Sequence, residues 1–301
     1  MTAKVAERSS QLVLGLDPDP AALWPSAEES AAGIADPAQA AATGALAHCR
    51  ALIDATGHAC VAVKPQLARF EALGAPGRDA LGEVCRYARA ADLLVIADGK
   101  RGDIDVTAEA YAASLLGGLD TPFGHVAGLE ADIVTVNPLM GRDAIAPFVS
   151  AARARGAGVL LLVRTSNPGA ADVEELELAA GGRLWERLAG LVDELGAAGE
   201  SGLSDVGAVI GATVPGHLER ARELMGAAVF LLPGIGAQGG RVEDLAAAFA
   251  PGPAGGLISA SRSIARAHEG AAGAPEAAAR AEAERLRERA WELSGGAVST
   301  R

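Results

Sequence analysis

Short apolar runs alternate with longer helical segments along the chain, and this alternation is the clearest pattern in the sequence. Each run is rich in Val, Ile, Leu or Ala, is short enough to be a buried strand, and stops at polar residues, proline or glycine. The predicted strands are 11–16, 60–63, 93–97, 133–136, 159–163, 206–210, 229–232 and 256–259. Continuous apolar strands of this kind are typical of a parallel sheet that is covered on both faces.

Helical segments fill the spaces between these strands. The predicted helices are 37–56, 78–88, 106–116, 143–154, a long helix within 173–195, 217–225, 242–249 and about 275–293. Strand–helix pairs repeated in this way predict an α/β fold, a (β/α)8 TIM barrel in a single domain over residues 1–301. A doubly wound sheet also alternates and is the lesser alternative. We expect a short N-terminal lead-in, a loop at 21–36 and a mobile C-terminal tail after about 294.

The composition narrows the class of protein and of partner. With 301 residues, 50% of them hydrophobic, the chain has enough material for one large core. A net charge of -12 argues against a general nucleic-acid or anionic-membrane surface, although a pocket can still be locally basic. Three features predict a cytoplasmic protein. The cysteines have no C-x-x-C spacing, and the start of the sequence is unlike a secretory signal. No apolar run approaches the ~18 residues of a membrane span.

Polar side chains lie just past the carboxyl ends of the predicted strands. In a barrel these ends form one face of the molecule, and catalytic residues lie on that face. The residues that follow the strands in this way are Asp17, Lys64, Asp98, Lys100, Asn137, Ser166, Thr213 and Arg262. We therefore expect a site for a small molecule at this face.

The third predicted strand runs directly into three charged residues, Asp98, Lys100 and Asp103. Asp98 and Lys100 are two positions apart, so on an extended chain they point to the same side. An isolated D-x-K sequence is often only a solvated strand end with an ion pair. Burying such groups unpaired is costly, however, and the full D-x-K-x-x-D spacing after an apolar strand favours a functional site.

Two loops near the end of the chain favour a phosphate ligand. The glycine-rich stretch 233–240 follows the seventh predicted strand, and Arg262 follows the eighth. Glycines let backbone N–H groups approach an anion closely, and an arginine can bind it with two hydrogen bonds. Phosphate sites of barrels are frequently built from these two loops. A glycine-rich turn without a ligand is the alternative, and the arginine after the next strand counts against it.

These residues resemble the orotidine 5′-phosphate decarboxylase family. The sequence D-x-K-x-x-D-I at 98–104 is similar to the family signature, and four further segments occur in the right order. They are GLDP at 15–18, VKPQ at 63–66, VRTSNPGA at 163–170 and PGIGAQGG at 233–240. The spelling DGKRGDI, with VNPLMG at 136–141, resembles the longer-chain bacterial subgroup (type 2). The resemblance extends from about Gln11 to Ile264, and one departure is the bulky pair Asp105-Val106 after the signature.

The resemblance implies the decarboxylation of orotidine 5′-monophosphate to uridine 5′-monophosphate and CO2 in pyrimidine biosynthesis, without a metal or an organic cofactor. Lys64, Asp98, Lys100 and Asp103 would form an alternating charge array, and Lys100 would protonate C6 of the base. The family also implies a homodimer, in which Asp103 and Thr107 act in the site of the neighbouring subunit.

Contacts to the rest of the nucleotide follow from the same resemblance. Asp17 and Lys64 would hold ribose hydroxyls, and Ser166 would hydrogen-bond the pyrimidine. Gln238, Gly239 and Arg262 would bind the 5′-phosphate, with Gln238 also near the base.

Two other functions remain open from the sequence. The nearer is a sister barrel enzyme, a magnesium-dependent decarboxylase or aldolase that acts on an open-chain sugar phosphate. Such an enzyme would need a metal and would have no use for base contacts at Ser166 and Gln238. The other is a non-catalytic nucleotide-binding barrel that keeps only the phosphate contacts, and the intact charge array argues against it.

Overall fold

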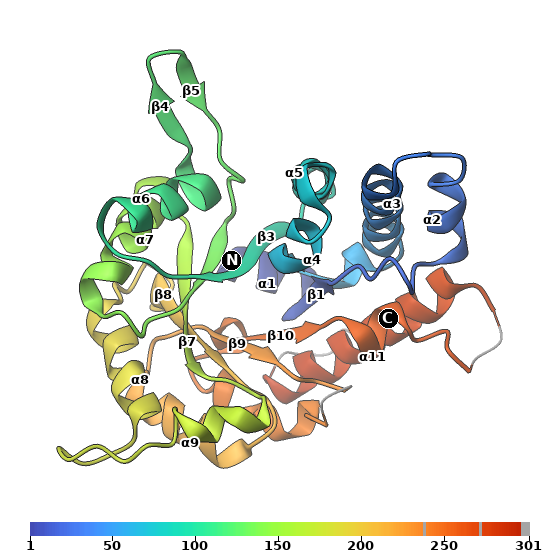
Figure 1. The fold of residues 1–301 in the computed structure, drawn as a ribbon. Coiled ribbons are helices and arrows are strands. Elements are labelled where there is room, and N and C mark those ends of the chain that lie inside the picture. The colour runs from blue at the N-terminus through green and yellow to red at the C-terminus, as the bar shows by residue number, and fades with distance from the viewer. Residues whose placement is uncertain (237–238, 271–272, 296–301) are drawn as a thin grey trace.

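The computed structural model of the protein describes residues 1–236, 239–270 and 273–295. Parallel strands close into a barrel in which neighbours follow the order β1, β10, β9, β8, β7, β6, β3, β2. Figure 1 shows the chain as a ribbon with most of these strands labelled. These strands are β1 Leu12–Leu16, β2 Ala62–Pro65, β3 Leu94–Arg101, β6 Ile133–Val136, β7 Gly158–Arg164, β8 Val206–Ile210, β9 Phe230–Pro233 and β10 Gly256–Ala260. Every predicted strand is confirmed. Because β1 pairs with both β2 and β10, the doubly wound alternative is wrong.

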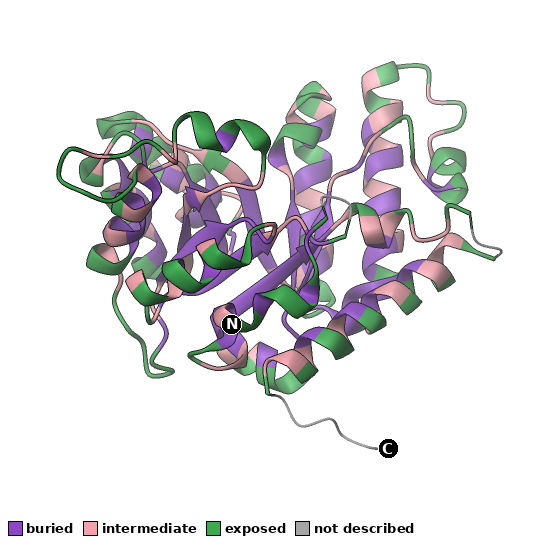
Figure 2. Cartoon of the chain, turned by 90° about the horizontal axis from the view of Figure 1, so that it is seen from below, coloured by how far each residue is buried: buried purple, intermediate pink, exposed green. Residues whose placement is uncertain are grey.

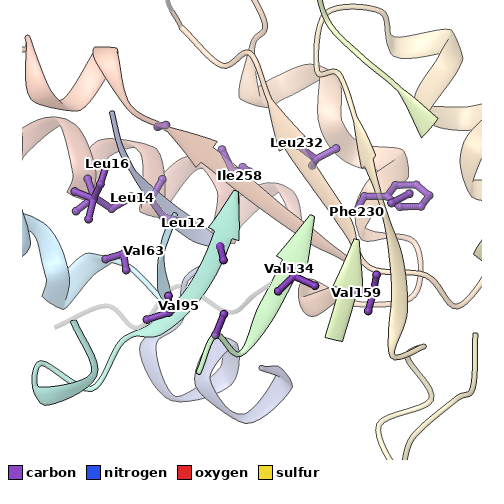
Figure 3. Close-up of a cluster of buried hydrophobic side chains, with 14 of the residues drawn as sticks. Leu12, Leu14, Leu16, Val63, Val95, Val134, Val159, Phe230, Leu232 and Ile258 are labelled. Carbon is purple, nitrogen blue, oxygen red and sulfur yellow. The ribbon is translucent and has the colours of Figure 1, made fainter. Parts of the chain in front are cut away.

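The strands are buried on both faces, which explains why each is a continuous apolar run. Successive side chains of a strand point to opposite faces, so Val13 packs inside the barrel while Leu12 and Leu14 pack outward against the helices. Figure 3 shows the outward-facing cluster. Val5, from the unpredicted helix α1 (Thr2–Arg8), belongs to the inner cluster together with Ile96. In Figure 2 the buried strands lie inside helices whose exposed sides face outward.

Helices occupy each position where the sequence predicts one. They are α3 Pro37–Thr56, α5 Gly74–Ala90, α6 Asp105–Ala112, α7 Arg142–Arg155, α8 Leu184–Leu195, α9 Pro215–Leu224, η4 Val242–Phe249 and α11 Pro275–Leu293. α3 begins at the predicted residue because proline fits its first turn and Asp36 Oδ1 accepts a hydrogen bond of 2.8 Å from the Ala38 N–H. Two segments depart from α-helical geometry: η4 is a 3₁₀ helix, and α6 continues into a π-helical turn, η2 (Ala113–Gly117).

The shorter elements were not predicted. The stretch 21–36, expected to be a loop, contains α2 (Pro25–Ser30), because proline begins the helix and Trp24 and Ala27 are buried. β4 (Leu119–Thr121) and β5 (Gly124–Val126) form an antiparallel hairpin that stands away from the barrel in Figure 1. The other short elements are η1 Gly57–Ala59, α4 Leu67–Glu71, η3 Pro168–Asp172, η5 Pro253–Gly255 and α10 Arg262–Ala265.

The C-terminal tail follows α11. The tail predicted to be mobile after about 294 falls mostly on residues 296–301, outside the described residues. Within the described ranges, no helix is both long and apolar enough to cross a membrane.

Cys49, Cys60 and Cys85 are free and buried. Burial raises the pKa of Cys60 and Cys85 to about 12, so these thiols stay protonated at neutral pH.

Candidate active site

A cavity of about 390 Å³ lies at the carboxyl ends of the strands, where a barrel places its active site. Its wall comes from β2, β3, β8, β9 and β10 and from the segments that follow β1, β2, β7, β9 and β10. The predicted site residues that line the cavity are Asp17, Lys64, Asp98, Lys100, Ser166 and Arg262. Residues from both ends of the sequence therefore meet at one site.

Asp98 is the centre of this site and binds both lysines. Lys64 Nζ lies 2.5 Å from Asp98 Oδ2, and Lys100 Nζ lies 2.5 Å from Oδ1. Two neutral donors complete the shell: Gln66 Nε2 donates to Oδ2 at 3.2 Å, and Thr135 Oγ1 donates to Oδ1 at 3.0 Å. A carboxylate offers about four lone-pair positions, so these four donors occupy it fully. Asp98 therefore acts as an anchor that orients the two ammonium groups.

The ionisation of Asp98 follows from this shell. Burial alone would raise its pKa, since only 5% of the residue is exposed. The charges of Lys64 and Lys100 and the hydrogen bonds they donate outweigh burial and lower the pKa of Asp98 to about 2. The carboxylate is therefore ionised throughout the physiological range of pH.

The backbone at Lys100 is unusual and shapes the site. Lys100 has a φ of 47°, in the left-handed region that is costly for a residue with a Cβ. The pairing of β3 with β6 shifts register between Ala97 and Arg101, so the strand bulges around Lys100. The extended chain predicted from Asp98 to Lys100 is therefore wrong at Lys100, because the bulge breaks that geometry. Both lysines still bind the Asp98 carboxylate.

Asp17 and Ser166 lie on other parts of the wall. Asp17 lines the cavity, and its Oδ1 is buried without a hydrogen-bond partner among the described residues. Ser166 packs against Gly211, where an added Cβ would lie 2.9 Å from the Ser166 Cα. Glycine at this position therefore allows the β7 and β8 strand ends to approach each other closely beside the cavity.

The loop that carries Ser166 is tied down by Glu174. The Thr165 N–H donates to Glu174 Oε2 at 2.9 Å, and Thr165 Oγ1 donates to Oε1 at 2.9 Å. Arg164 Nη1 donates to the same Oε2 at 3.2 Å. Because these bonds join the two ends of a short loop segment, they fix the cavity wall on both sides of Ser166.

The predicted phosphate-binding loops lie at the ends of β9 and β10. Gly234 and Gly236 have φ values of 106° and 75°, which favour glycine. Arg262 begins α10, and its side chain has no hydrogen-bond or ion-pair partner among the described residues. Its guanidinium group is therefore available to an anion in the cavity. Gly239 lies outside the cavity wall, with a φ of 89°, and Gln238 lies outside the described residues.

Asp103 and Thr107 do not line the cavity of their own chain. Asp103 Oδ1 accepts a hydrogen bond of 2.8 Å from the Ile104 N–H, and Thr107 is exposed at the start of α6. Ile104 and Val106 lie beside them and are 51% and 74% exposed. Two of the ten predicted site residues are thus found on an apolar surface next to the site.

Sequence reasoning did not assign roles to Gln66 and Thr135, although both bind Asp98. Thr135 is the polar residue in the buried strand β6, and a polar side chain in such a run was a usable signal. Gln66 follows β2 directly, in the same way as the predicted residues. Among the residues that the structure describes, no group of three or more His, Cys, Asp or Glu side chains is placed to hold a metal ion.

Comparison with known proteins gives a consistent result. A model of the Orotidine 5'-phosphate decarboxylase / HUMPS family matches residues 10–281. The orotidine 5′-phosphate decarboxylase of Deinococcus radiodurans is 46% identical over 213 residues, which cover 71% of this chain and 74% of that protein. The Haloarcula marismortui protein of the same name is 40% identical over 271 residues, 89% of this chain and 86% of that one. The structure of Leishmania donovani OMP decarboxylase superposes with a TM-score of 0.73 at 32% identity, covering 98% of this chain and 99% of that chain.

Proposed function

Because the chain belongs to the orotidine 5′-phosphate decarboxylase / HUMPS family, we propose that its cavity binds orotidine 5′-monophosphate and that Lys100 protonates C6 as carbon dioxide leaves. The reaction is that of a carboxy-lyase of pyrimidine biosynthesis, and its nucleotide product is uridine 5′-monophosphate. The observation that carries the proposal is the pair of ammonium groups held by one carboxylate in the wall of the cavity.

The positions of the cationic side chains in the cavity suit the two anionic groups of this substrate. Orotidine 5′-monophosphate has a carboxylate on its base and a phosphate at its 5′ end. The cavity has Lys64 and Lys100 at one part of its wall and Arg262 at another. The Asp17 carboxylate in the cavity wall suits a ribose hydroxyl, which Lys64 can also contact. Ser166 is assigned to the pyrimidine, and Gln238 and Gly239 are assigned to the phosphate together with Arg262.

The chemistry requires a fixed cation near C6. Loss of carbon dioxide leaves an electron pair in an sp² orbital that the π system of the base cannot delocalise. An ammonium group can stabilise this developing charge and then supply the proton. Asp98 stays ionised and holds the Lys100 ammonium in place through one of its three N–H groups. The other two N–H groups are not used by this bond. Binding energy from the remote phosphate can serve the same transition state.

A homodimer with shared sites is part of the proposal. Asp103 and Thr107 fit a role in the cavity of a second subunit, because they lie outside the cavity of their own. The exposed apolar side chains around them supply a contact surface, with Ile104 and Val106 beside the signature and Leu139 and Met140 in the loop after β6. An apolar patch next to a site is typical of an interface.

We assign this enzyme to the cytoplasm. The support is the state of Cys49, Cys60 and Cys85, which are free and buried. Proteins that keep all their cysteines reduced are typical of reducing compartments. The substrate is a small nucleotide, and the acidic net charge of -12 gives no support to a nucleic-acid partner.

The test is turnover of orotidine 5′-monophosphate, followed by ultraviolet absorbance. Lys100→Ala should remove nearly all turnover while the circular dichroism spectrum stays unchanged. Lys4→Ala is the matched control, because Lys4 binds Glu7 and Asp92 on α1 and the α5–β3 turn. Near-normal turnover in folded Lys100→Ala protein would falsify the role of Lys100. Loss of activity with a chelator, restored by Mg²⁺, would favour a metal-dependent sugar-phosphate enzyme instead.

A further inference from the structure

We propose that Thr135 is a positioning residue that holds Lys100 in its catalytic geometry through a single hydroxyl group. The proposal rests on the proposed role of Lys100. Thr135 lies on β6, does not line the cavity and is 0% exposed, so it acts on the reaction only through its neighbours.

The hydroxyl group of Thr135 makes two hydrogen bonds, one as an acceptor and one as a donor. It accepts from the Lys100 backbone N–H at 2.9 Å and donates to Asp98 Oδ1 at 3.0 Å. Asp98 Oδ1 in turn binds the Lys100 ammonium at 2.5 Å. The main chain and the side chain of Lys100 are therefore tied to the same small network, and such hydrogen bonds in series strengthen one another.

The register of the two strands explains why a hydroxyl is needed here. Ala97 pairs with Val134 and Arg101 pairs with Val136, so three residues of β3 lie opposite the one residue Thr135 of β6. A bulge of this kind leaves backbone groups of the longer strand without their normal partners. An unpaired N–H inside a protein is costly, so a side-chain acceptor at position 135 compensates for the bulge.

The bulge carries the strained residue. Lys100 has a φ of 47°, a strained conformation for a non-glycine residue that persists only where its surroundings hold it. The Thr135 hydroxyl binds the N–H of that same residue. Without this bond the backbone can relax toward a regular strand, which would move the Lys100 ammonium relative to C6. Small displacements of a catalytic group lower kcat more than they weaken substrate binding.

Kinetics on three purified variants separate positioning from stability. Thr135→Val has nearly the same shape but no hydroxyl, and Thr135→Ser restores the hydroxyl. Thr56→Val is the matched control, because Thr56 is also 0% exposed and its hydroxyl donates to the Leu52 carbonyl at 2.8 Å within α3. We expect Thr135→Val to lower kcat by about 10- to 100-fold, with KM changed less than about threefold. We expect Thr135→Ser to stay within about threefold of the parent, and Thr56→Val to keep the parent kcat.

Hydrogen exchange of the Lys100 amide, measured by NMR without substrate, tests the same bond without using the reaction. The amide should exchange at least about 10-fold faster in Thr135→Val than in the parent or in Thr135→Ser. Parent protein that fails to turn over the nucleotide would overturn the proposed function, while this exchange result would still decide the role of Thr135.

Three kinetic results would overturn the inference. The first is a Thr135→Val enzyme that keeps kcat within about twofold of the parent. The second is a Thr135→Ser enzyme that loses as much as the valine variant, because the effect would then belong to packing and not to the hydroxyl group. Equal losses in Thr135→Val and Thr56→Val would likewise assign both effects to stability.

Discussion

Replacing Asp98 with asparagine removes the carboxylate between Lys64 and Lys100, and we expect it to destabilise the protein as well as to abolish turnover. Each ammonium lies 2.5 Å from one carboxylate oxygen, and Asp98 and Lys64 are only 5% and 7% exposed. Asparagine keeps the shape of the side chain but carries no charge. Lys64 would therefore remain buried without a counter-ion, and burying an unpaired charge is costly.

Two lines of reasoning give the magnitude. Removing one partner of a buried ion pair costs about 3–5 kcal/mol. Independently, the fall in the pKa of Asp98 from 3.8 to about 2 corresponds to about 2.4 kcal/mol of stability from the ionised carboxylate. We expect the asparagine variant to lose about 2–5 kcal/mol of unfolding free energy at pH 7.

The pH dependence has a definite sign. The pKa of Asp98 is lower in the folded protein than in the unfolded chain, so its contribution is complete above the unfolded value of 3.8 and is lost as the pH falls through about 2. The stability difference between parent and variant should therefore narrow by about 1 kcal/mol between pH 7 and pH 3.

Urea unfolding followed by circular dichroism measures both quantities. Lys100→Ala is the control, because it leaves the Lys64–Asp98 pair intact and removes only the more exposed lysine; its loss should stay below about 1 kcal/mol. An asparagine variant that is as stable as the parent at pH 7 would refute the counter-ion reasoning. A stability difference that is the same at pH 7 and pH 3 would contradict the assigned pKa.

Two further predictions concern the phosphate and the dimer. Arg262→Ala should lower kcat/KM on the nucleotide by about 100-fold or more and much less on a substrate without the phosphate, because a remote contact also serves the transition state. Arg266→Ala is the control, and an equal loss on both substrates would mean that Arg262 does not act on the phosphate. Equal amounts of inactive Lys100→Ala and inactive Asp103→Ala subunits, once exchanged, should recover about a quarter of the parent activity, since half the dimers would hold one intact site. If mass spectrometry verifies the exchange and no activity returns, Asp103 serves its own barrel.

The sequence predicts the barrel well because parallel strands that are buried on both faces appear in the sequence as continuous apolar runs. It also predicts six of the residues that line the cavity, since polar residues that end such strands lie on one face. Asn137 and Thr213 follow their strands in the same way but do not line the cavity. The missed elements are short. α2 has six residues, and the β4–β5 hairpin has three in each strand, so neither extends over enough residues to show a period.

The details of the site depend on contacts between strands and could not be read from one strand alone. The bulge at Lys100 arises from the pairing of β3 with β6. Gly99 and Gly102 are compatible with an irregular strand, but they do not show that the bulge falls on Lys100. Thr135 acts on a residue that is 35 positions away in the sequence. Its presence in an apolar run signals a buried polar role, but the partner is visible only in the folded chain.

The closure of the barrel has a consequence for how the protein is made. Leu12 of β1 pairs with Ile258 of β10, so the first strand to leave the ribosome waits for the last one before the sheet can close. Until then β1 and β10 each present an open strand edge, and unpaired edges of apolar strands are prone to associate with other chains. Pairings between such distant segments also form slowly. Protection of β1 during synthesis is therefore the step at which we expect this chain to depend most on chaperones.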